Sequence, residues 1–458
     1  MRRGTVFALF LLALVLGSSL VYVPKWQVGN MVIEDQMERL KLENELRGSL
    51  AQIYGIAFVL VGLYFLIRRM KAADRVAELS REGQVNERFT RAINQLGASR
   101  TNGEKRLEIR LGGIFALEGI AKISSEYYSP VIEILTAYIR ENAPWRGDPE
   151  ERIEKLRLVG GAANSHDQVV MLATIAADIQ AVLSVLGRRR LTYLEGEDYR
   201  LDLSHTNLSG ASIAGGNLRG ALIQRTDLRN AMLARSDISN AYLDDCWMAK
   251  AQMSYANLER SSLKNARLQG AILMAAKLHQ AKLTQASLEE ADLRGADLRA
   301  ADLREANLAR ANLQKAKLRG ANLRGAKLLG AVLEGADLEA ADLRVSDLRE
   351  TNIKGANMWR ATVQGANLMG SNLTGANLKS ADLRLVDLRD VVLDSANLEG
   401  ANLERANLQR ARFEKAILRK AKGIPVDRLA EAGSLYAARM DSELKKRIKN
   451  ECPQLLQK

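Results

Sequence analysis

A repeat of five residues runs through nearly half of this chain and limits the folds that it can adopt. Counting from Leu203, every fifth residue up to Leu418 is apolar, which gives 44 units in one register without an insertion. Leucine occupies 35 of these positions, and alanine occupies 32 of the 44 positions that lie two residues earlier. A short period that continues for this long is the signature of a solenoid.

The spacing inside each unit indicates how the chain turns. Residues two apart point to the same side of an extended chain, so the small residue and the leucine both point inward. The other three residues must then form a turn. An α-helix is excluded because a period of five residues defines no face on a helix with 3.6 residues per turn. We therefore expect coils with a corner every five residues, stacked about 4.8 Å apart by backbone hydrogen bonds.

Several units resemble the A-(D/N)-L-x-x motif of the pentapeptide-repeat family, among them Ala296-Asp297-Leu298, Ala306-Asn307-Leu308 and Ala376-Asn377-Leu378. The resemblance implies a right-handed quadrilateral parallel β-helix with four units per coil. The 44 units over residues 201–422 would then form 11 coils, a rod roughly 50 Å long at the strand spacing. The family includes DNA mimics that inhibit type II topoisomerases, secreted effectors and membrane proteins without an assigned activity, so the resemblance says little about function.

The N-terminal segment, residues 1–71, is expected to form a transmembrane helical hairpin. Thr5–Val23 and Gly48–Ile67 are two long apolar stretches without a charged residue. At about 1.5 Å per residue, each is long enough to cross the core of a bilayer, which is about 30 Å thick. A signal peptide that is cleaved after the first stretch is the competing interpretation.

The flanking charges predict the orientation of the hairpin. Arg2 and Arg3 precede the first span, and four basic residues follow the second, at positions 68, 69, 71 and 75, whereas the loop between the spans carries both signs. The positive-inside rule then places both termini in the cytoplasm. The expected location is the inner membrane, which the protein would cross more than once. If the first span were cleaved, the second would still hold the large C-terminal part on the same side.

Residues 72–200 are expected to form a helical domain. Met70–Leu96 continues helically from the membrane, Arg106–Ser124 has apolar residues at near-helical spacing, and Val169–Leu186 is a further apolar helix. Ser129-Pro130 predicts a helix start that opens Val131–Arg140, and a flexible link with Gly160, Gly161 and Asn164–Asp167 follows. A HEAT-like pair of short antiparallel helices is the expected product. The stretches Arg110–Glu118 and Asp178–Arg189 resemble a segment that recurs in bacterial pentapeptide-repeat membrane proteins, for which no activity is settled.

A solenoid needs ends that cover its open edges. The helical domain is placed to cover the first coil, and residues 423–458 are expected to form a helical cap on the last. Pro425 breaks the repeat, and Val426–Leu435 and Ser442–Lys449 are predicted as short helices. The stretch Gly433–Arg439 is similar to tails of other bacterial pentapeptide arrays. In some soluble family members the C-terminal element forms a dimer, and a homo-oligomer is open for this chain.

The residues that usually carry enzyme chemistry are sparse and scattered. His166, His205 and His279 have no metal-ligand spacing, Cys246 takes an inward position in place of alanine, and Cys452 is far from it. No phosphate-binding glycine loop, nucleophile elbow or zinc-helix motif is present. We therefore expect no catalytic residue, no metal, no cofactor and no enzymatic activity.

Charge separates the remaining classes of function. The chain has a formal net charge of +13, and the repeat segment Leu201–Lys420, with 32 basic and 25 acidic residues, contributes +7 of it. A protein that mimics DNA must present the negative charge of a phosphate backbone, so a topoisomerase-binding DNA mimic is disfavoured. Because the spacer residues mix both signs, binding to nucleic acid is not favoured either.

Stacking of residues 20 apart predicts a candidate interaction surface. Arg304, Arg324, Arg344 and Arg384 share one column, with Gln364 in the gap, and Asp302, Asp342 and Asp382 lie in the adjacent column. Ion pairs between successive coils are one interpretation, each worth about 0–1 kcal/mol. A docking strip for an acidic partner or anionic lipid is the other. The outward aromatic residues Tyr242, Trp247, Tyr255 and Trp359 are candidate anchors for a protein partner.

These observations lead to a hypothesis with two alternatives. The main hypothesis is a non-enzymatic, membrane-tethered scaffold that presents a rigid rod to protein partners on the cytoplasmic side. The first alternative is a regulator or accessory subunit of another membrane protein, binding through the spans or through Ile33–Leu46. The second is the DNA mimic that the basic rod disfavours.

Overall fold

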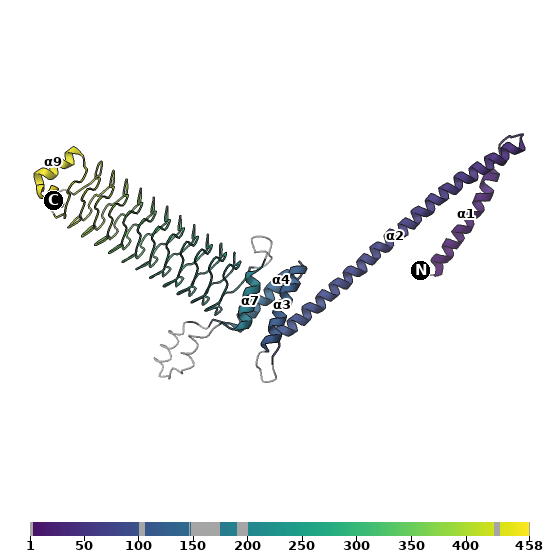
Figure 1. The fold of residues 1–458 in the computed structure, drawn as a ribbon, viewed down its shortest axis with the longest axis horizontal. Helices are drawn as coiled ribbons and strands as arrows, with labels where there is room; N and C mark the ends of the chain where they lie inside the picture. The colour runs from purple at the N-terminus through teal and green to yellow at the C-terminus, as the bar shows by residue number, and fades with distance from the viewer. Residues whose placement is uncertain are drawn as a thin grey trace. The chain divides into compact units, whose positions relative to one another are not determined.

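The computed structural model describes residues 3–99, 106–145, 147, 175–189, 200–425 and 431–457. The chain forms two compact units, Met1–Arg88 and Phe89–Lys458. The first unit holds helix α1 (Arg3–Gly29) and most of helix α2 (Gln36–Leu96). The second holds the end of α2, three further helices, the stacked coils and a short C-terminal helix (Figure 1). The expected domain limits at residues 71, 200 and 422 stay predictions.

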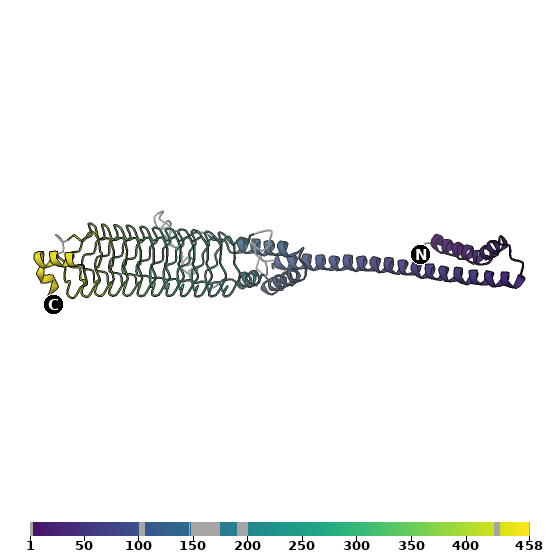
Figure 2. The same cartoon turned by 90° about the horizontal axis from the view of Figure 1, so that it is seen from above.

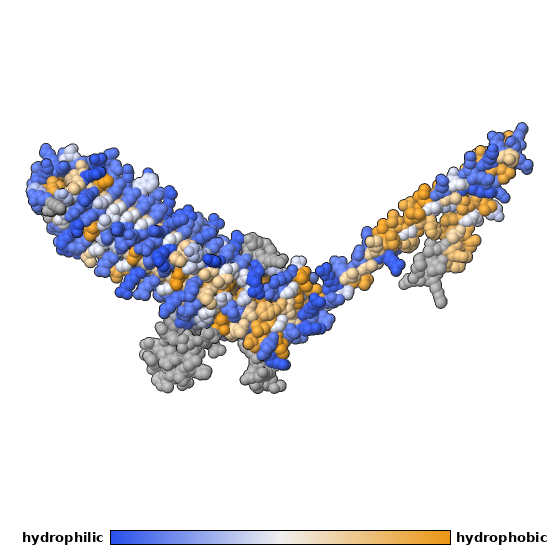
Figure 3. Space-filling view, viewed as in Figure 1, coloured by the Kyte–Doolittle hydropathy of each residue, from blue (hydrophilic) through white to orange (hydrophobic). Residues whose placement is uncertain are grey.

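Both apolar stretches near the N-terminus are helical, and each is long and apolar enough to cross a membrane. Their apolar side chains are exposed rather than packed into a core (Figure 3). α1 continues through Pro24 to Gly29, beyond the expected end of the first span at Val23. The hydroxyl groups of Ser19 and Tyr54 lie 2.8 Å apart and join α1 to α2 within the first unit.

Four helical segments form the first part of the second unit. The end of α2 packs with α3 (Leu107–Ile123), α4 (Tyr128–Asn142) and α7 (Ala177–Gly187) around a core of buried aliphatic side chains. Gly113 of α3 allows a close approach to α2, because a Cβ atom there would lie 2.7 Å from the carbonyl oxygen of Ala92. The expected helices over Met70–Leu96 and Arg106–Ser124 are confirmed.

Two details of this helical region differ from the prediction. α4 begins at Tyr128 rather than after a cap at Ser129. Pro130 is thus its third residue, where the missing N–H still falls among first-turn groups without an intrahelical partner. α7 begins at Ala177, and the expected helical residues 169–174 lie outside the described residues, as does the predicted link at Gly160, Gly161 and Asn164–Asp167.

Two ion pairs join α3 to α7. Arg110 lies beside Asp178, with Nη1 and Oδ2 3.6 Å apart, and both side chains are buried. Arg188 forms a bidentate pair with Glu118, with both N–O distances at 3.1 Å, and its side chain is half exposed. The pair of Arg110 and Asp178 joins the starts of α3 and α7, and the pair of Glu118 and Arg188 joins the two helices towards their ends. The helices α3 and α7 therefore run parallel. The two stretches that carried the resemblance therefore contact each other.

The coils have the predicted period. From Asp202 to Lys422, the residue before each centre forms a parallel bridge with the residue 20 positions later, as in Asp202 with Leu222 and Asn402 with Lys422. Four units therefore make one coil, and Figures 1 and 2 show the coils stacked along one axis. Nearly every centre in the described coils donates its N–H to a carbonyl of the next coil, for example Leu303 to Asn322 at 2.7 Å. The solenoid expected from the spacing is confirmed.

The turn of each unit uses two features of the sequence. The Asp or Asn before the centre accepts the N–H of the residue two positions later with its side-chain oxygen, as in Asn207 with Ser209 at 3.1 Å. This Asx turn replaces a backbone turn. The fifth residue then takes a positive φ, such as +57° at His205, the left-handed conformation in which glycine is unstrained.

The interior of the rod is a column of leucine and alanine side chains, and nearly all of them are completely buried. Where serine or threonine replaces alanine, its hydroxyl group usually donates to a backbone carbonyl. Thr206, Ser236 and Ser346, for example, each bind the carbonyl three residues earlier at 2.6 Å. These hydroxyl groups are therefore buried without losing a hydrogen-bond partner.

The helical region covers the first coil, as expected. Gln180 of α7 pairs with the backbone of Ser212 through both ends of its side-chain amide, accepting at 2.9 Å and donating at 2.7 Å. Arg189 donates to the carbonyls of Asn217 and Arg219. Further edge groups of the coil bind backbone atoms just after α4 and at the end of α7. Asn207 donates its N–H to Ala143, Trp145 donates its N–H to His205, and Asn217 donates its N–H to Gly187. These bonds close the edge of the first coil. An unpaired edge would be a template for aggregation.

The C-terminal segment closes the other end, by a route that differs in part from the prediction. Ser434 and Arg439 bridge Arg412 and Ile417, a spacing of 22 instead of 20, so the chain adds further rungs after a two-residue offset. Residues 431–435 of the expected helix Val426–Leu435 are therefore not helical, and residues 426–430 lie outside the described residues. The later prediction of a helix over Ser442–Lys449 is confirmed by α9 (Ser442–Glu451), which the 3-10 helix η3 (Pro453–Leu456) follows.

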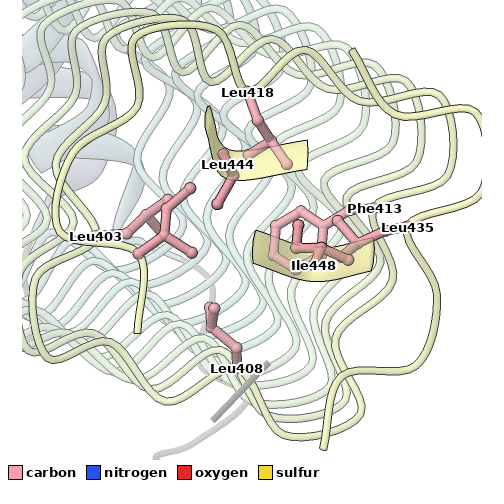
Figure 4. Close-up of a pocket in the computed structure, with 8 residues that line it drawn as sticks. Leu403, Leu408, Phe413, Leu418, Leu435, Leu444 and Ile448 are labelled. Atoms are coloured by element: carbon pink, nitrogen blue, oxygen red, sulfur yellow. The ribbon is translucent and has the colours of Figure 1, made fainter. Parts of the chain in front are cut away.

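Apolar side chains seal this C-terminal end (Figure 4). Leu435 and Leu444 and Ile448 of α9 cover Phe413 and Leu418 of the last regular coil, leaving an apolar cavity of about 10 Å³. That volume is about the smallest that can hold one water molecule, and the apolar lining offers a water no hydrogen-bond partner. The cavity is therefore a packing defect under the cap.

Candidate interaction surface

The rod presents four lateral faces. The first face consists of the units centred on Leu203 and every twentieth residue after it, and the second, third and fourth faces begin with the units centred on Leu208, Ile213 and Leu218. In each unit, the residue before the centre and the two residues after it point outward. A surface site on the rod is therefore made from residues of one face in successive coils.

The expected arginine column lies on the first face, but most of its ion pairs are formed differently from the prediction. Arg304, Arg344 and Arg384 each bind the aspartate two residues earlier in the same unit. In Arg304 with Asp302, Nε and Nη2 lie 2.8 and 2.7 Å from the two carboxylate oxygens. The prediction of pairs between coils is wrong for these three arginines, because the Asx turn brings the side chains two residues apart onto one side.

These two-pronged contacts lower the pKa values of the aspartates. Hydrogen bonds from the guanidinium of the paired arginine are the main reason why the pKa values of Asp302, Asp342 and Asp382 lie below the usual range. The arginine side chains themselves are about half exposed. At neutral pH each pair is thus an ionised, solvated group with no net charge.

The same contact recurs wherever the sequence reads Asp-Leu-Arg in the described coils. Besides the three pairs of the first face, the arginines at 229, 294, 299, 349 and 389 bind the aspartate two residues earlier. Pairs between coils exist elsewhere, for example Arg319 with Glu339 and Lys379 with Glu399. The tripeptide Asp-Leu-Arg is a signal in the sequence from which the in-unit pairs could have been predicted.

Arg324 is the exception within the column. Asn322 replaces the aspartate two residues earlier, and its side-chain oxygen accepts only the backbone N–H of Arg324, at 3.2 Å. Within the part of the chain that the structure describes, no carboxylate lies within ion-pair distance of this exposed guanidinium. Arg324 is therefore the member of the column without an ion pair of its own among the described residues, although its charge also helps to lower the pKa of Asp342.

The four candidate aromatic residues do not form one site. Tyr242 lies on the first face, Trp247 on the second, Tyr255 on the third and Trp359 on the fourth. Tyr242, Tyr255 and Trp359 each lie next to an arginine: Arg200, Arg235 and Arg360. Their separation on four faces excludes a shared binding patch.

Trp247 has a contact that the sequence did not predict. It is half-buried, and its ring lies 5.8 Å from the ring of Trp145, in the segment that follows α4. The guanidinium of Arg267 lies 3.7 Å from the centre of the Trp247 ring. Trp247 therefore helps to attach the helical region to the coils, and it is not a free anchor.

Two exposed apolar residues on the first face were missed. The side chains of Val345 and Leu385 are 60% and 51% exposed, and both residues have a positive φ. They lie two coils apart in one column, with Gly365 between them. The signal was present in the fifth position of each unit, where this chain otherwise has mostly glycine or polar residues.

The cysteines and histidines give no reactive centre among the described residues. Cys246 is buried, and this burial raises the pKa of its thiol to about 12. Cys452 is also buried, under the C-terminal cap. His205 and His279 each lie at an outward position of a repeat unit, and His166 falls outside the described residues. No group of three possible metal ligands occurs within the described ranges.

Comparison with known sequences identifies the coils. The family profile described as Pentapeptide repeats matches residues 217–247 and, in overlapping copies, residues 251–422. A comparison with curated proteins finds no match.

Solved structures with similar coils include proteins from cyanobacteria and from a plant. HetL of the cyanobacterium Nostoc sp. strain PCC 7120, involved in heterocyst differentiation regulation, is 38% identical, with 45% of this chain and 89% of HetL covered and a TM-score of 0.24. A protein of the Arabidopsis thaliana thylakoid lumen is 38% identical, covering 22% and 69%, with a TM-score of 0.21. A protein of the cyanobacterium Cyanothece 51142 is 30% identical, covering 24% and 85%, with a TM-score of 0.15.

Proposed function

The chain belongs to the pentapeptide-repeat family, and from this premise we propose that it is a non-enzymatic scaffold that is tethered to the membrane and binds protein partners through its rod. The observation that carries the proposal is the closure of both ends of the rod by the chain's own segments. With the edges occupied, the lateral faces are the surfaces that remain for contact. Their outward side chains, mixed in charge and anchored to a rigid backbone, suit protein recognition.

Two features support a role without catalysis. The thiol of Cys246, a possible nucleophile, is buried and has a raised pKa, which disfavours the reactive thiolate. Many of the aspartates on the rod are occupied by the Asx turns and by arginine contacts. Neither group is available for nucleophilic or acid–base chemistry in its present state.

Attachment to the bacterial inner membrane is the second part of the proposal. α1 and α2 each contain an apolar stretch long enough to span a bilayer, and the exposed apolar side chains of α2 fit a lipid environment. The basic residues on the flanks of the two stretches predict cytoplasmic termini. The helical region would then connect the spans to the rod by chain continuity.

A regulator or accessory subunit of another membrane protein is the alternative. It would bind through α1, α2 or the stretch Ile33–Leu46, with the rod in a sensing role. A topoisomerase-binding DNA mimic is disfavoured by the net charge of +7 on Leu201–Lys420.

Crosslinking in intact cells distinguishes these roles. The tagged full-length protein is crosslinked, extracted in mild detergent and analysed by mass spectrometry for the residues that carry each link. A scaffold predicts reproducible links from outward residues of the rod to another protein. Links confined to residues 1–67 would favour the accessory-subunit alternative, and a rod without reproducible links to any protein would refute the scaffold.

A further inference from the structure

The positive charge of the rod and its cap is concentrated at the C-terminal end. Residues 405–458 contain 14 basic and 6 acidic residues, a net charge of +8. Residues 201–404 form most of the rod and contain 26 basic and 24 acidic residues, a net charge of only +2. The lateral faces are therefore nearly neutral over most of their length, and an anionic partner would meet the charge of this chain at its C-terminal end.

The cap helix α9 holds part of this charge in a fixed position. Leu444 and Ile448 line the apolar cavity under the cap (Figure 4), and Ile448 is completely buried. Just before the helix, Oδ2 of Asp441 accepts the backbone N–H of Lys420 at 2.7 Å. The helix is thus attached to the last coil at its start and along its apolar face, so its outward side chains have a defined place on the rod.

Three lysines lie on the outward side of α9. Lys445 and Lys449 are one helical turn apart, Lys446 follows Lys445, and all three are exposed. In the part of the chain that the structure describes, no carboxylate lies within ion-pair distance of any of the three. The fourth cation of the helix, Arg447, lies 3.7 Å from Glu451. The three lysines therefore present positive charge without an ion pair among the described residues.

The last coil extends this positive surface. Three further exposed cations lie near the start of α9, at positions 420, 422 and 439. The nearby Glu399 already binds Lys379 at 2.9 Å, and this hydrogen bond is the main cause of its lowered pKa, to which Lys420 also contributes. Asp441 and Glu443 are the acids on the surface itself. We call the six cations the basic tip: Lys420, Lys422, Arg439, Lys445, Lys446 and Lys449.

We propose that the basic tip binds the anionic lipid surface of the membrane that anchors the protein. This inference rests on the membrane attachment proposed above and goes beyond it, because it gives the rod a second point of attachment. An anionic leaflet attracts clustered lysines and arginines over about one screening length, ~8 Å at physiological ionic strength. The rod would then be attached through the spans at one end and through the basic tip at the other, with its lateral faces free for protein partners.

The side chains of α9 favour a charged surface over a pocket in a protein. The outward residues of this helix include no apolar or aromatic side chain, whereas protein interfaces depend on aromatic or arginine anchors in well-packed pockets. Insertion into a bilayer needs a free apolar face, and Leu444 and Ile448 are used in the cap. The contact is therefore electrostatic and superficial, and it should depend strongly on salt.

Two other anionic partners fit the basic tip less well. Single-stranded nucleic acid is usually held by exposed aromatic rings that stack on its bases, but Phe413 is buried and Tyr436 is partly buried. Tethering also keeps the lipid surface within reach of the tip, which raises its effective concentration above that of a free polyanion. A second copy of the chain offers no segment of net negative charge, since residues 1–67, 68–200 and 201–404 carry +1, +2 and +2.

The test measures energy transfer from the tip of the full-length protein to lipids that carry an acceptor dye. Asn450→Cys, next to Lys449, carries the donor dye, and Ala300→Cys in the middle of the rod is the reference. The native thiols of Cys246 and Cys452 are buried and should not react. We expect more transfer from position 450 in vesicles of phosphatidylcholine with phosphatidylglycerol than in phosphatidylcholine alone, and a smaller change from position 300. In about 1 M salt, where the screening length is about 3 Å, this gain should be lost.

Charge variants distinguish the basic tip from the net charge of the protein. K445E/K446E/K449E should lose the gain in anionic vesicles, and K445Q/K446Q/K449Q should reduce it without adding negative charge. Because the three side chains are exposed, both variants should keep the protease resistance of the rod. The matched control makes the same change in net charge and should keep the gain, since it replaces three exposed lysines elsewhere on the rod with glutamate: Lys250, Lys315 and Lys354.

The other outcomes overturn the inference. Equal transfer from position 450 in neutral and anionic vesicles, or an equal loss in K445E/K446E/K449E and in the control, would refute the lipid contact. If duplex DNA at equal phosphate concentration displaces the tip from anionic vesicles, nucleic acid is the preferred partner and the lipid proposal is wrong. Flotation of the vesicles tests the premise separately. A protein that floats with them but shows no gain keeps its membrane attachment and loses only the tip contact, whereas a protein that does not float loses both.

Discussion

The buried ion pair between α3 and α7 permits a quantitative test of what holds the helical region together. Arg110 and Asp178 are only 7% and 2% exposed. The Tyr138 hydroxyl group donates to Asp178 at 2.6 Å and accepts from Arg110 at 3.0 Å. Arg110→Met leaves the buried carboxylate without its cation, and removal of one partner of a buried pair costs about 3–5 kcal/mol. We expect that loss for Arg110→Met and a similar one for Asp178→Leu.

The double variant R110M/D178L should cost much less than the sum of the two single variants. It removes both charges at once, and apolar replacement of a buried pair is often neutral or stabilising. Arg188→Met is the matched control, because its pair with Glu118 joins the same two helices but its side chain is 54% exposed. An exposed pair contributes about 0–1 kcal/mol, so this variant should change little.

Amide hydrogen exchange of the full-length protein in detergent measures the effect in place. A loss of about 3–5 kcal/mol should accelerate exchange from α3 and α7 by about 10²- to 10⁴-fold if these helices open locally. Exchange in the central coils, around Ala321 for example, serves as an internal reference and should not change. Equal effects of Arg110→Met and Arg188→Met, or an additive double variant, would contradict this account of the buried pair.

Four further predictions concern the rod and the hairpin. Deletion of Ala321 alone should make the later coils sensitive to protease, because every following leucine leaves the core column. Deletion of the whole coil Ala321–Ala340 should instead leave a shorter rod that resists protease. Equal protease sensitivity of the two deletion variants would refute the register. Val345→Gly should stabilise the rod by about 1 kcal/mol in thermal unfolding through relief of left-handed strain, and a loss of stability would argue against that strain. Replacing Arg304, Arg324, Arg344 and Arg384 with glutamine should cost little stability at pH 7, because surface ion pairs contribute little. The partner aspartates have lowered pKa values, so the small loss of stability should be present above about pH 4 and vanish as the pH falls through the lowered values. Reporter fusions after Lys71 and after Lys458 should both report cytoplasm, and a cytoplasmic signal from the loop Val28–Leu46 would contradict the hairpin.

Much of the rod could be predicted because its structure is local and repeated. The inward positions follow from the five-residue period, the coil of four units was implied by the resemblance to the pentapeptide-repeat family, and the bridges from Asp202 onward confirm both. Of the candidate site, the alignment of the arginine column on one face was predicted correctly. Its pairing was not, since the choice between an aspartate two residues away and one in the next coil depends on how the Asx turn directs both side chains.

Prediction failed where the repeat ends. The bridge between Arg412 and Ser434 has a spacing of 22 residues instead of 20. No local pattern in the sequence predicts this two-residue offset. The ring contact between Trp145 and Trp247 joins residues that are far apart in the sequence, and nothing in the repeat distinguishes Trp247 from the other outward aromatic residues.

The sequence by itself determined the architecture of the rod and the positions of the two apolar helices, because burial in a short repeat and in a long apolar stretch depends on neighbours along the chain. The tertiary structure decided how the rod is closed and what its surface offers. Gln180 meets Ser212 and Arg110 meets Asp178 only once the helices are packed. Val345 and Leu385 lie in one column of the rod only because the coils stack in register. Those contacts link residues that are distant along the chain, where packing rather than periodicity sets which side chains come together.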